Sequence, residues 1–134
     1  MEASDIAETM MRADAFSQWL GIECLEVGPG ISVLRMTIRK EMLNGFGVAH
    51  GGITFSFADS AFAFISNGRG RHAVSIETSI SHTRPLKEGD VIIATAEEDF
   101  LGSKTGVYRV KVTKENGETV ALFKGTVFRK DQSW

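Results

Sequence analysis

The sequence predicts an α+β fold: an antiparallel sheet of five to six strands wrapped around one central helix, with a short helix near the N-terminus. Two observations lead to this prediction. The longest apolar stretch, residues 42–68, contains one segment long enough for a buried helix. After residue 73 the apolar side chains recur at every second position, as they do in strands that bury one face. A sheet with an apolar face needs a cover, and only the helix in the apolar stretch is long and apolar enough to supply it.

The first predicted elements are one helix over residues 4–20 and a hairpin of two strands. Ser4 can cap the helix, and apolar side chains recur along it at the spacing of a single helical face. The segments 21–27 and 31–38 are predicted to be strands, joined by a Gly-Pro-Gly turn. Cys24, the only cysteine, lies in the first strand, where we expect a small buried hydrophobe rather than a nucleophile.

The central helix is predicted over residues 51–67. Its Phe, Ala and Ser residues leave no wholly polar face, so we expect it to be buried nearly all round. The pair Asn67-Gly68 supplies residues that commonly end a helix.

Four antiparallel strands are predicted after the helix, over residues 73–82, 91–101, 107–114 and 119–129. Turn-forming pairs such as Asn116-Gly117 separate them. A sheet of this kind around one helix is the hotdog architecture. No linker, repeat or low-complexity segment divides the chain, so residues 1–134 are expected to form a single domain.

The composition argues against several classes of partner. The 134 residues carry a formal net charge of −2, which gives no attraction for nucleic acid or an anionic membrane. The first residues are acidic where a secretory signal is basic, and one cysteine forms no disulfide within the chain. The apolar stretch holds Asn, His, Asp and several glycines, unlike a membrane helix. We therefore expect a cytoplasmic protein that has no metal site, because His72 and His82 are isolated.

One carboxylate interrupts the apolar stretch. Asp59 is the only Asp, Glu, Lys or Arg in residues 42–68, where roughly six charged residues would be ordinary. Its neighbours on the same helix face are mostly apolar, which predicts a raised pKa for the carboxyl group. Such a group suits a general base or an acyl-accepting nucleophile. A structural Asp, hydrogen-bonded to a neighbouring loop, is the alternative.

A glycine-rich loop, residues 44–50, leads into the central helix. A helix N-terminus presents unpaired N–H groups and a partial positive charge, and glycines let a ligand approach the backbone closely. The loop lacks the Gly-Lys-Ser/Thr of a phosphate-binding loop. Stabilising the oxyanion of a tetrahedral acyl intermediate near Gly51 is therefore the preferred interpretation, and a plain glycine-rich turn is the alternative.

Asp59 and Gly51 cannot meet on one substrate within one chain. Residues eight apart on a helix are separated by roughly 12 Å along its axis. If both act on one acyl group, they come from two chains whose helices lie side by side and antiparallel. The sequence thus predicts a homodimer with active sites at its interface.

At this point the residues resemble a known family. The run NGFGVAHGGITFSFADSAFAFISN, residues 44–67, resembles the signature of the PaaI-type hotdog thioesterases, named for phenylacetate degradation. Their pattern is Asn-Gly-x-Gly-x-x-His-Gly-Gly, then an apolar helix containing Ala-Asp, then Asn. The resemblance implies hydrolysis of acyl-CoA thioesters by a homotetramer of two hotdog dimers, with no metal and no cofactor. Phe46 stands where many relatives have His or another polar residue, so phenylacetyl-CoA is not inherited as the substrate.

Carried over by position, the resemblance implies roles for five residues. Asp59 would be the catalytic carboxylate, and the Gly51 N–H from the other subunit would polarise the thioester carbonyl. Asn44 would orient the thioester or the attacking water, and His50 would support the site beside the leaving sulfur. Ser75 matches a position where some relatives place a water-orienting serine.

Four cations are candidates for contacts with the phosphates of CoA, a task that suits Arg and Lys. Arg69 and Arg71 follow the central helix, while Arg84 and Lys87 lie in a later loop. Two rival functions stay open at this stage. One is a non-catalytic acyl-CoA-binding hotdog module. The other is a hotdog hydratase or dehydratase, which generally needs a His with a carboxylate as acid and base.

Overall fold

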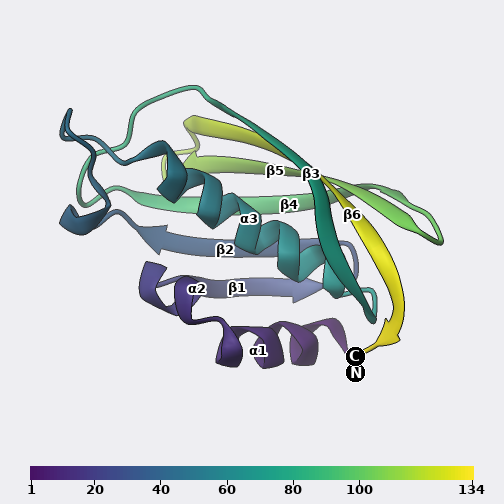
Figure 1. Ribbon diagram of the computed structural model, residues 1–134. Coiled ribbons are helices and arrows are strands. Elements are labelled where there is room, and N and C mark those ends of the chain that lie inside the picture. Colours follow the sequence, from purple (N-terminus) through teal and green to yellow (C-terminus); the bar gives the residue numbers. More distant parts are fainter.

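The computed structural model describes residues 1–134 and has the predicted hotdog architecture (Figure 1). Its helices are α1 (Ala3–Ala13), α2 (Ala15–Leu20), the 3-10 turn η1 (Lys40–Met42) and α3 (Gly51–Asn67). Its strands are β1 (Glu23–Gly28), β2 (Ile31–Thr37), β3 (Arg71–His82), β4 (Val91–Leu101), β5 (Thr105–Lys114) and β6 (Thr119–Ser133). The predicted central helix and the predicted strand at 91–101 have the bounds of α3 and β4.

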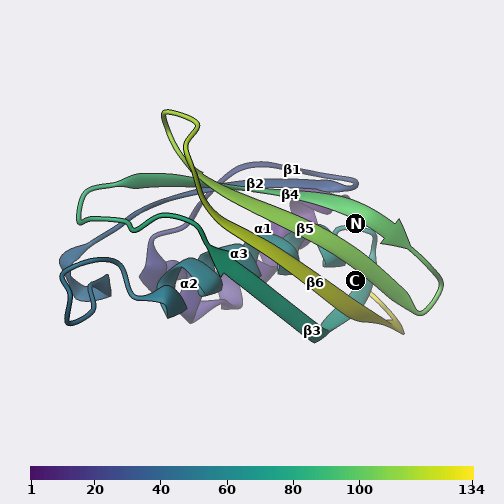
Figure 2. The ribbon, with the colours of Figure 1, turned by 90° about the horizontal axis from the view of Figure 1, so that it is seen from above.

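All six strands form one antiparallel sheet in the order β1-β2-β4-β5-β6-β3. The predicted hairpin is β1 with β2. The chain then crosses under the sheet as α3, and β3 pairs with the last strand, β6, rather than with the next one. The sheet curves around α3, and the helices lie on its concave side (Figures 1 and 2). β1 and β3 are therefore the two edges of the sheet.

The core lies between α3 and the concave face of the sheet. Phe57, Phe64 and Ile65 of α3 are fully buried there. They belong to one cluster of 24 buried residues that also includes inward-facing residues of β2, β4, β5 and β6. Burial of apolar surface stabilises the fold, and it fixes α3 against the sheet. The helix that carries the candidate site is thus anchored to the sheet by its buried face.

α3 is expected to be buried nearly all round, and the structure leaves one stripe of the helix open. Gly52 is exposed, and Ser56, Asp59 and Ala63 are partly exposed. These residues follow one another at steps of three or four, so they share one face of the helix. The sheet covers the opposite side of α3, and in the single chain no element covers this stripe completely.

The predicted single helix over residues 4–20 is two helices. Asp14 has φ −97° and ψ 83°, which are not helical values, so α1 ends there and α2 begins after it. The Asp14 side chain accepts a hydrogen bond from the Ser17 N–H at 2.9 Å, as the N-cap of α2. Asp is among the residues that cap a new helix more readily than they continue one. Ser4 forms no cap, because α1 begins one residue earlier.

Cys24 is exposed, contrary to the expectation of a buried hydrophobe. It lies on β1, whose residues are mostly exposed because this strand is an edge of the sheet. Partial burial nevertheless raises the pKa of the Cys24 thiol, which reduces the fraction of reactive thiolate. None of the helices is both long enough and apolar enough to span a membrane.

Candidate active site

The site begins at the N-terminus of α3. His50 is the N-cap residue, and its Nδ1 accepts a hydrogen bond from the Gly52 N–H at 2.9 Å. The neutral His50 ring therefore carries its proton on Nε2. Neither a loop carbonyl nor a side chain of this chain accepts from the Gly51 N–H. The helix end thus offers one N–H with the partial positive charge of the helix dipole behind it.

The loop before α3 is held by Asn44. Its backbone N–H donates to the Val48 carbonyl at 2.8 Å, and its side-chain Oδ1 accepts from the Phe46 N–H at 2.9 Å. The Asn44 Nδ2 has no partner within the chain, so it is free to donate to a ligand. Gly47 has φ +77°, a left-handed conformation that favours glycine. Phe46, at the tip, is 92% exposed.

Asp59 lies on the open stripe of α3, two turns after Gly51. Its carboxylate makes no hydrogen bond and no ion pair within the chain, so the structure gives no support to the alternative of a loop-bonded structural Asp. Burial raises the pKa of the Asp59 carboxyl group, and the negative charge of Asp14 raises it further. A half-buried carboxylate without partners is available for chemistry.

The structure brings Asn44, His50 and Gly51 together at one end of α3 but leaves Asp59 apart from them. On a regular helix, Gly51 and Asp59 are separated by roughly 12 Å along the axis, as predicted. Ser75 is exposed on the edge strand β3, opposite Val127 of β6. Within one chain, the candidate groups around Gly51 and the Asp59 carboxylate therefore lie at different places along α3.

A cleft of about 320 Å³ lies beside Gly51. It is lined by residues of the glycine-rich loop, the start of α3, the end of β3 and the loop that follows: Val48, Ala49, Gly51, Thr54, His82, Thr83, Arg84, Pro85 and Leu86. Of the four cations considered for CoA, only Arg84 lines this cleft. The position suits a ligand whose reactive end reaches the Gly51 N–H.

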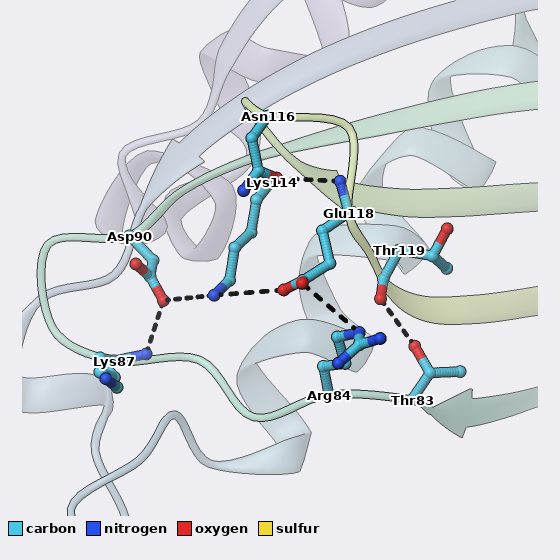
Figure 3. Close-up of polar contacts among 8 residues, drawn as sticks. All are labelled: Thr83, Arg84, Lys87, Asp90, Lys114, Asn116, Glu118 and Thr119. Atoms are coloured by element: carbon cyan, nitrogen blue, oxygen red, sulfur yellow. Dashed lines mark hydrogen bonds and ion pairs between the residues drawn. The ribbon is translucent and has the colours of Figure 1, made fainter.

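The ion pairs around Arg84 are shown in Figure 3. Arg84 Nε lies 3.6 Å from Glu118, whose other oxygen lies 3.5 Å from Lys114 Nζ, and Lys114 reaches Asp90 at 3.7 Å. Lys87 joins this group through its backbone, which donates to Asp90 at 2.8 Å. The Arg84–Glu118 pair is long and its Arg side chain is 59% exposed, so the pair is weak. Arg84 can therefore exchange Glu118 for a phosphate.

Arg69 and Arg71 lie at the other end of α3 and have structural partners. Arg69 binds the Glu98 carboxylate with two hydrogen bonds, at 2.6 and 3.1 Å, and Tyr108 donates to the same carboxylate. Arg71 donates to the backbone carbonyls of Ser103, Arg129 and Lys130. The structure does not bring these two arginines together with Arg84 and Lys87.

Two residues near the site were missed by sequence reasoning. His82 lies against Gly51: its Nε2 is 3.3 Å from the position that a Cβ on Gly51 would take. Only the crossing of β3 over the start of α3 places it there, and no local pattern indicates this. Asp14, whose charge acts on Asp59, had a signal: Asp is among the residues preferred at a helix N-cap.

Together, the fold and these groups define a hotdog protein with the elements of an acyl-transfer site. A model of the thioesterase superfamily matches residues 46–121. The acyl-coenzyme A thioesterase PaaI of Escherichia coli is 40% identical over 123 residues, covering 92% of this chain and 88% of PaaI. The chain belongs to the thioesterase superfamily, and the prediction of a PaaI-type thioesterase is confirmed.

Solved structures agree with this assignment. The structure of E. coli PaaI has a TM-score of 0.95 at 38% sequence identity, covering 98% of this chain and 95% of that chain. A Streptococcus mutans protein solved with bound acetyl-CoA has a TM-score of 0.82 at 26% identity, covering 84% and 91%. The fold is therefore shared with a protein that holds an acyl-CoA.

Proposed function

We propose that this chain hydrolyses acyl-CoA thioesters at sites formed between two subunits. Each site combines Asp59 of one subunit with the Gly51 N–H of the other. The observation that carries the proposal is the separation of these groups on one helix, together with the absence of any partner for either within the chain. The similarity to acyl-coenzyme A thioesterase PaaI supports CoA thioesters as the substrate class.

The edge strand β3 supports a two-fold partner. An edge strand presents unpaired N–H and C=O groups that can join a second chain. β3 has 12 residues, and its Val74 and Ile76 side chains are 41% and 58% exposed. A two-fold axis perpendicular to this edge makes the two α3 helices antiparallel, as the shared site requires. A homotetramer of two such dimers and a cytoplasmic location belong to the same proposal.

In the proposed reaction, the Gly51 N–H donates to the thioester carbonyl oxygen and stabilises the negative charge that develops there. Asp59 either takes a proton from a water that attacks the carbonyl carbon or attacks that carbon itself. The C–S bond then breaks, and CoA leaves as a thiolate that takes up a proton. In the second route, water afterwards hydrolyses the acyl–Asp59 anhydride. Both routes yield a free acid and CoA.

The remaining groups are assigned by where they lie. Asn44 can donate from its free Nδ2, and His50 from Nε2, to the thioester or the leaving sulfur. Arg84 borders the cleft at Gly51 and is the preferred contact for a CoA phosphate. Ser75 and Lys87 stay predictions for water orientation and phosphate binding. The structural contacts of Arg69 and Arg71 favour a role in the fold over CoA binding.

The first test is turnover of Asp59→Asn with a panel of acyl-CoA substrates. We expect a loss of at least about 100-fold in kcat, because the variant cannot accept a proton or attack the thioester. Release of CoA is followed with a thiol reagent in a Cys24→Ser background, since the exposed Cys24 would otherwise react. Near-normal turnover would refute the catalytic role of Asp59. Binding of acyl-CoA by the Cys24→Ser chain without thiol release would favour the binding module instead.

The second test concerns the Gly51 N–H. Gly51→Pro removes this one donor, and proline is well tolerated at the first position of a helix. We expect kcat to fall about 100- to 1,000-fold, as for other oxyanion donors. Gly51→Ala is the matched control, because it adds a side chain near His82 but keeps the N–H.

Mixing the two inactive chains tests whether the site is shared. A mixed dimer of Asp59→Asn with Gly51→Pro contains one site with both groups intact and one with neither. We expect such dimers to recover up to about half of the normal activity per dimer. No recovery in verified mixed dimers would contradict a shared site, while leaving hydrolysis itself intact.

A further inference from the structure

Asp14 is fixed on α3 by a short hydrogen-bonded chain. Its Oδ1 accepts from the Ser17 N–H at 2.9 Å, and its Oδ2 accepts from the Ser17 hydroxyl at 2.6 Å. The Ser17 hydroxyl also lies 2.8 Å from the hydroxyl of Ser60 on α3. Ser17 and Ser60 are 1% and 8% exposed, so water does not compete freely for these bonds. The link joins the break between α1 and α2 to the residue that follows Asp59.

The hydrogen bonds of this link run in one direction, toward Asp14. A serine hydroxyl has one proton to donate, and the Ser17 proton goes to the carboxylate at the shorter distance. Ser60 therefore donates to Ser17. Every donor in this chain of hydrogen bonds points toward Asp14, whose two carboxylate oxygens accept. A negative charge is thus anchored beside the turn of α3 that carries Asp59.

In the core around Asp59, no positively charged side chain offsets the negative charge of Asp14. The buried inward-facing side chains of β2, β4, β5 and β6 are apolar except for two that have partners of their own: Ser32 donates to the Ala61 carbonyl and Tyr108 donates to Glu98. Glu98 is itself neutralised by Arg69. His50 and His82 lie at the N-terminal end of α3, about two turns from Asp59. Among the charged groups of the chain, Asp14 is the one whose charge raises the pKa of the Asp59 carboxyl group.

We propose that Asp14 is a positioning residue for hydrolysis: held to α3 through Ser17 and Ser60, its charge makes Asp59 a stronger base. This inference rests on the proposed role of Asp59. A carboxylate with a higher proton affinity takes a proton from water more readily in the transition state. The same charge disfavours ionisation of Asp59 in mildly acidic solution, so the effect has a signature in the pH dependence.

The test replaces Asp14 by Asn, which still accepts from the Ser17 N–H as an N-cap but carries no charge. We expect the acid limb of the kcat/KM profile to move to lower pH. The ratio of variant to wild-type kcat/KM should therefore rise as the pH is lowered from about 8 to about 5. Asp5→Asn is the matched control, since it removes an exposed carboxylate of α1 that does not act on Asp59.

A second variant separates position from charge. Ser60→Ala cuts the link but leaves the Asp14 carboxylate in the chain, so the acid limb of the kcat/KM profile should move in the same direction by a smaller amount. An acid limb that stays in place in Asp14→Asn overturns the proposal, even if activity falls, because a merely structural role lowers kcat without moving the limb.

A measurement without turnover keeps this test independent of the proposed function. The carboxyl 13C signal of Asp59, assigned by its loss in Asp59→Asn, is titrated in the free protein. We expect its midpoint to fall in Asp14→Asn and to stay in place in Asp5→Asn. Equal midpoints in wild type and Asp14→Asn would refute the inference. If instead Asp59→Asn is fully active, the proposed function fails while this titration still reports whether Asp14 acts on Asp59.

Discussion

Gly125→Ala should destabilise the fold through a single contact with Phe62. A Cβ on Gly125 of β6 would lie 2.6, 2.7 and 2.8 Å from three atoms of the Phe62 ring. Ordinary contacts begin near 3.4 Å, so the ring would have to move by about 0.8 Å. It has no room to do so. Phe62 is 2% exposed, and its ring packs against Tyr108 and Phe123 with centroids 5.9 and 5.5 Å away.

The magnitude follows from two opposing effects. Overpacking a core costs about 1–3 kcal/mol. Replacing glycine by alanine recovers about 0.4–1 kcal/mol through the unfolded chain, because Gly125 does not have a positive φ. The net expectation is a loss of about 1–2 kcal/mol in the free energy of unfolding. For a domain of this size that corresponds to a fall in Tm of roughly 3–10 °C.

The assay is thermal and denaturant unfolding at one fixed protein concentration. Gly45→Ala is the matched control, since a Cβ there meets nothing within 4 Å and the residue has no positive φ. Phe62→Leu frees space, so the double variant should be less destabilised than the sum of the two singles, by at least about 0.5 kcal/mol. If Gly125→Ala has the same Tm and denaturant midpoint as Gly45→Ala, the argument that the Phe62 ring has no room to move is refuted.

Two further predictions concern ionisation. Folding raises the pKa of the Asp59 carboxyl group, so ionisation of Asp59 opposes folding. The free energy of unfolding should therefore fall as the pH rises from 3.8, the ordinary pKa of an Asp side chain, through the raised pKa of Asp59 in the folded chain. Asp59→Asn should therefore raise Tm at neutral pH but not at pH below about 3.8, which calorimetry can check. A Tm difference between variant and wild type that stays the same at both pH values would contradict this. Burial and the neighbouring Glu98 raise the pKa of Tyr108, the only tyrosine. No tyrosinate absorbance should appear near pH ~10 while the chain is folded, although a free tyrosine is half ionised there.

Local patterns predicted most of the elements of this fold. The length of the apolar stretch and the Asn67-Gly68 pair predicted α3 with its observed bounds, and period-two alternation together with turn residues predicted the strands, because each signal needs only neighbours along the chain. The break at Asp14 was missed, although its capping pattern is local, because the apolar spacing runs through it. Cys24 was predicted to be buried but is exposed, because the sequence identifies β1 as a strand and does not show that β1 is an edge of the sheet.

For the candidate site, too, some features could be predicted from the sequence and others depended on the tertiary structure. The isolation of Asp59 in an apolar stretch, the glycines before α3 and the spacing of eight residues were all in the sequence, since helix geometry is fixed. The tertiary structure alone decided that β3 pairs with β6, that His82 lies against Gly51 and that Ser17 links Asp14 to Ser60. It also decided that Arg69 binds Glu98 while Arg84 borders the cleft. These contacts join residues far apart in the chain, and their partners are selected by packing and charge in three dimensions, which no local pattern encodes.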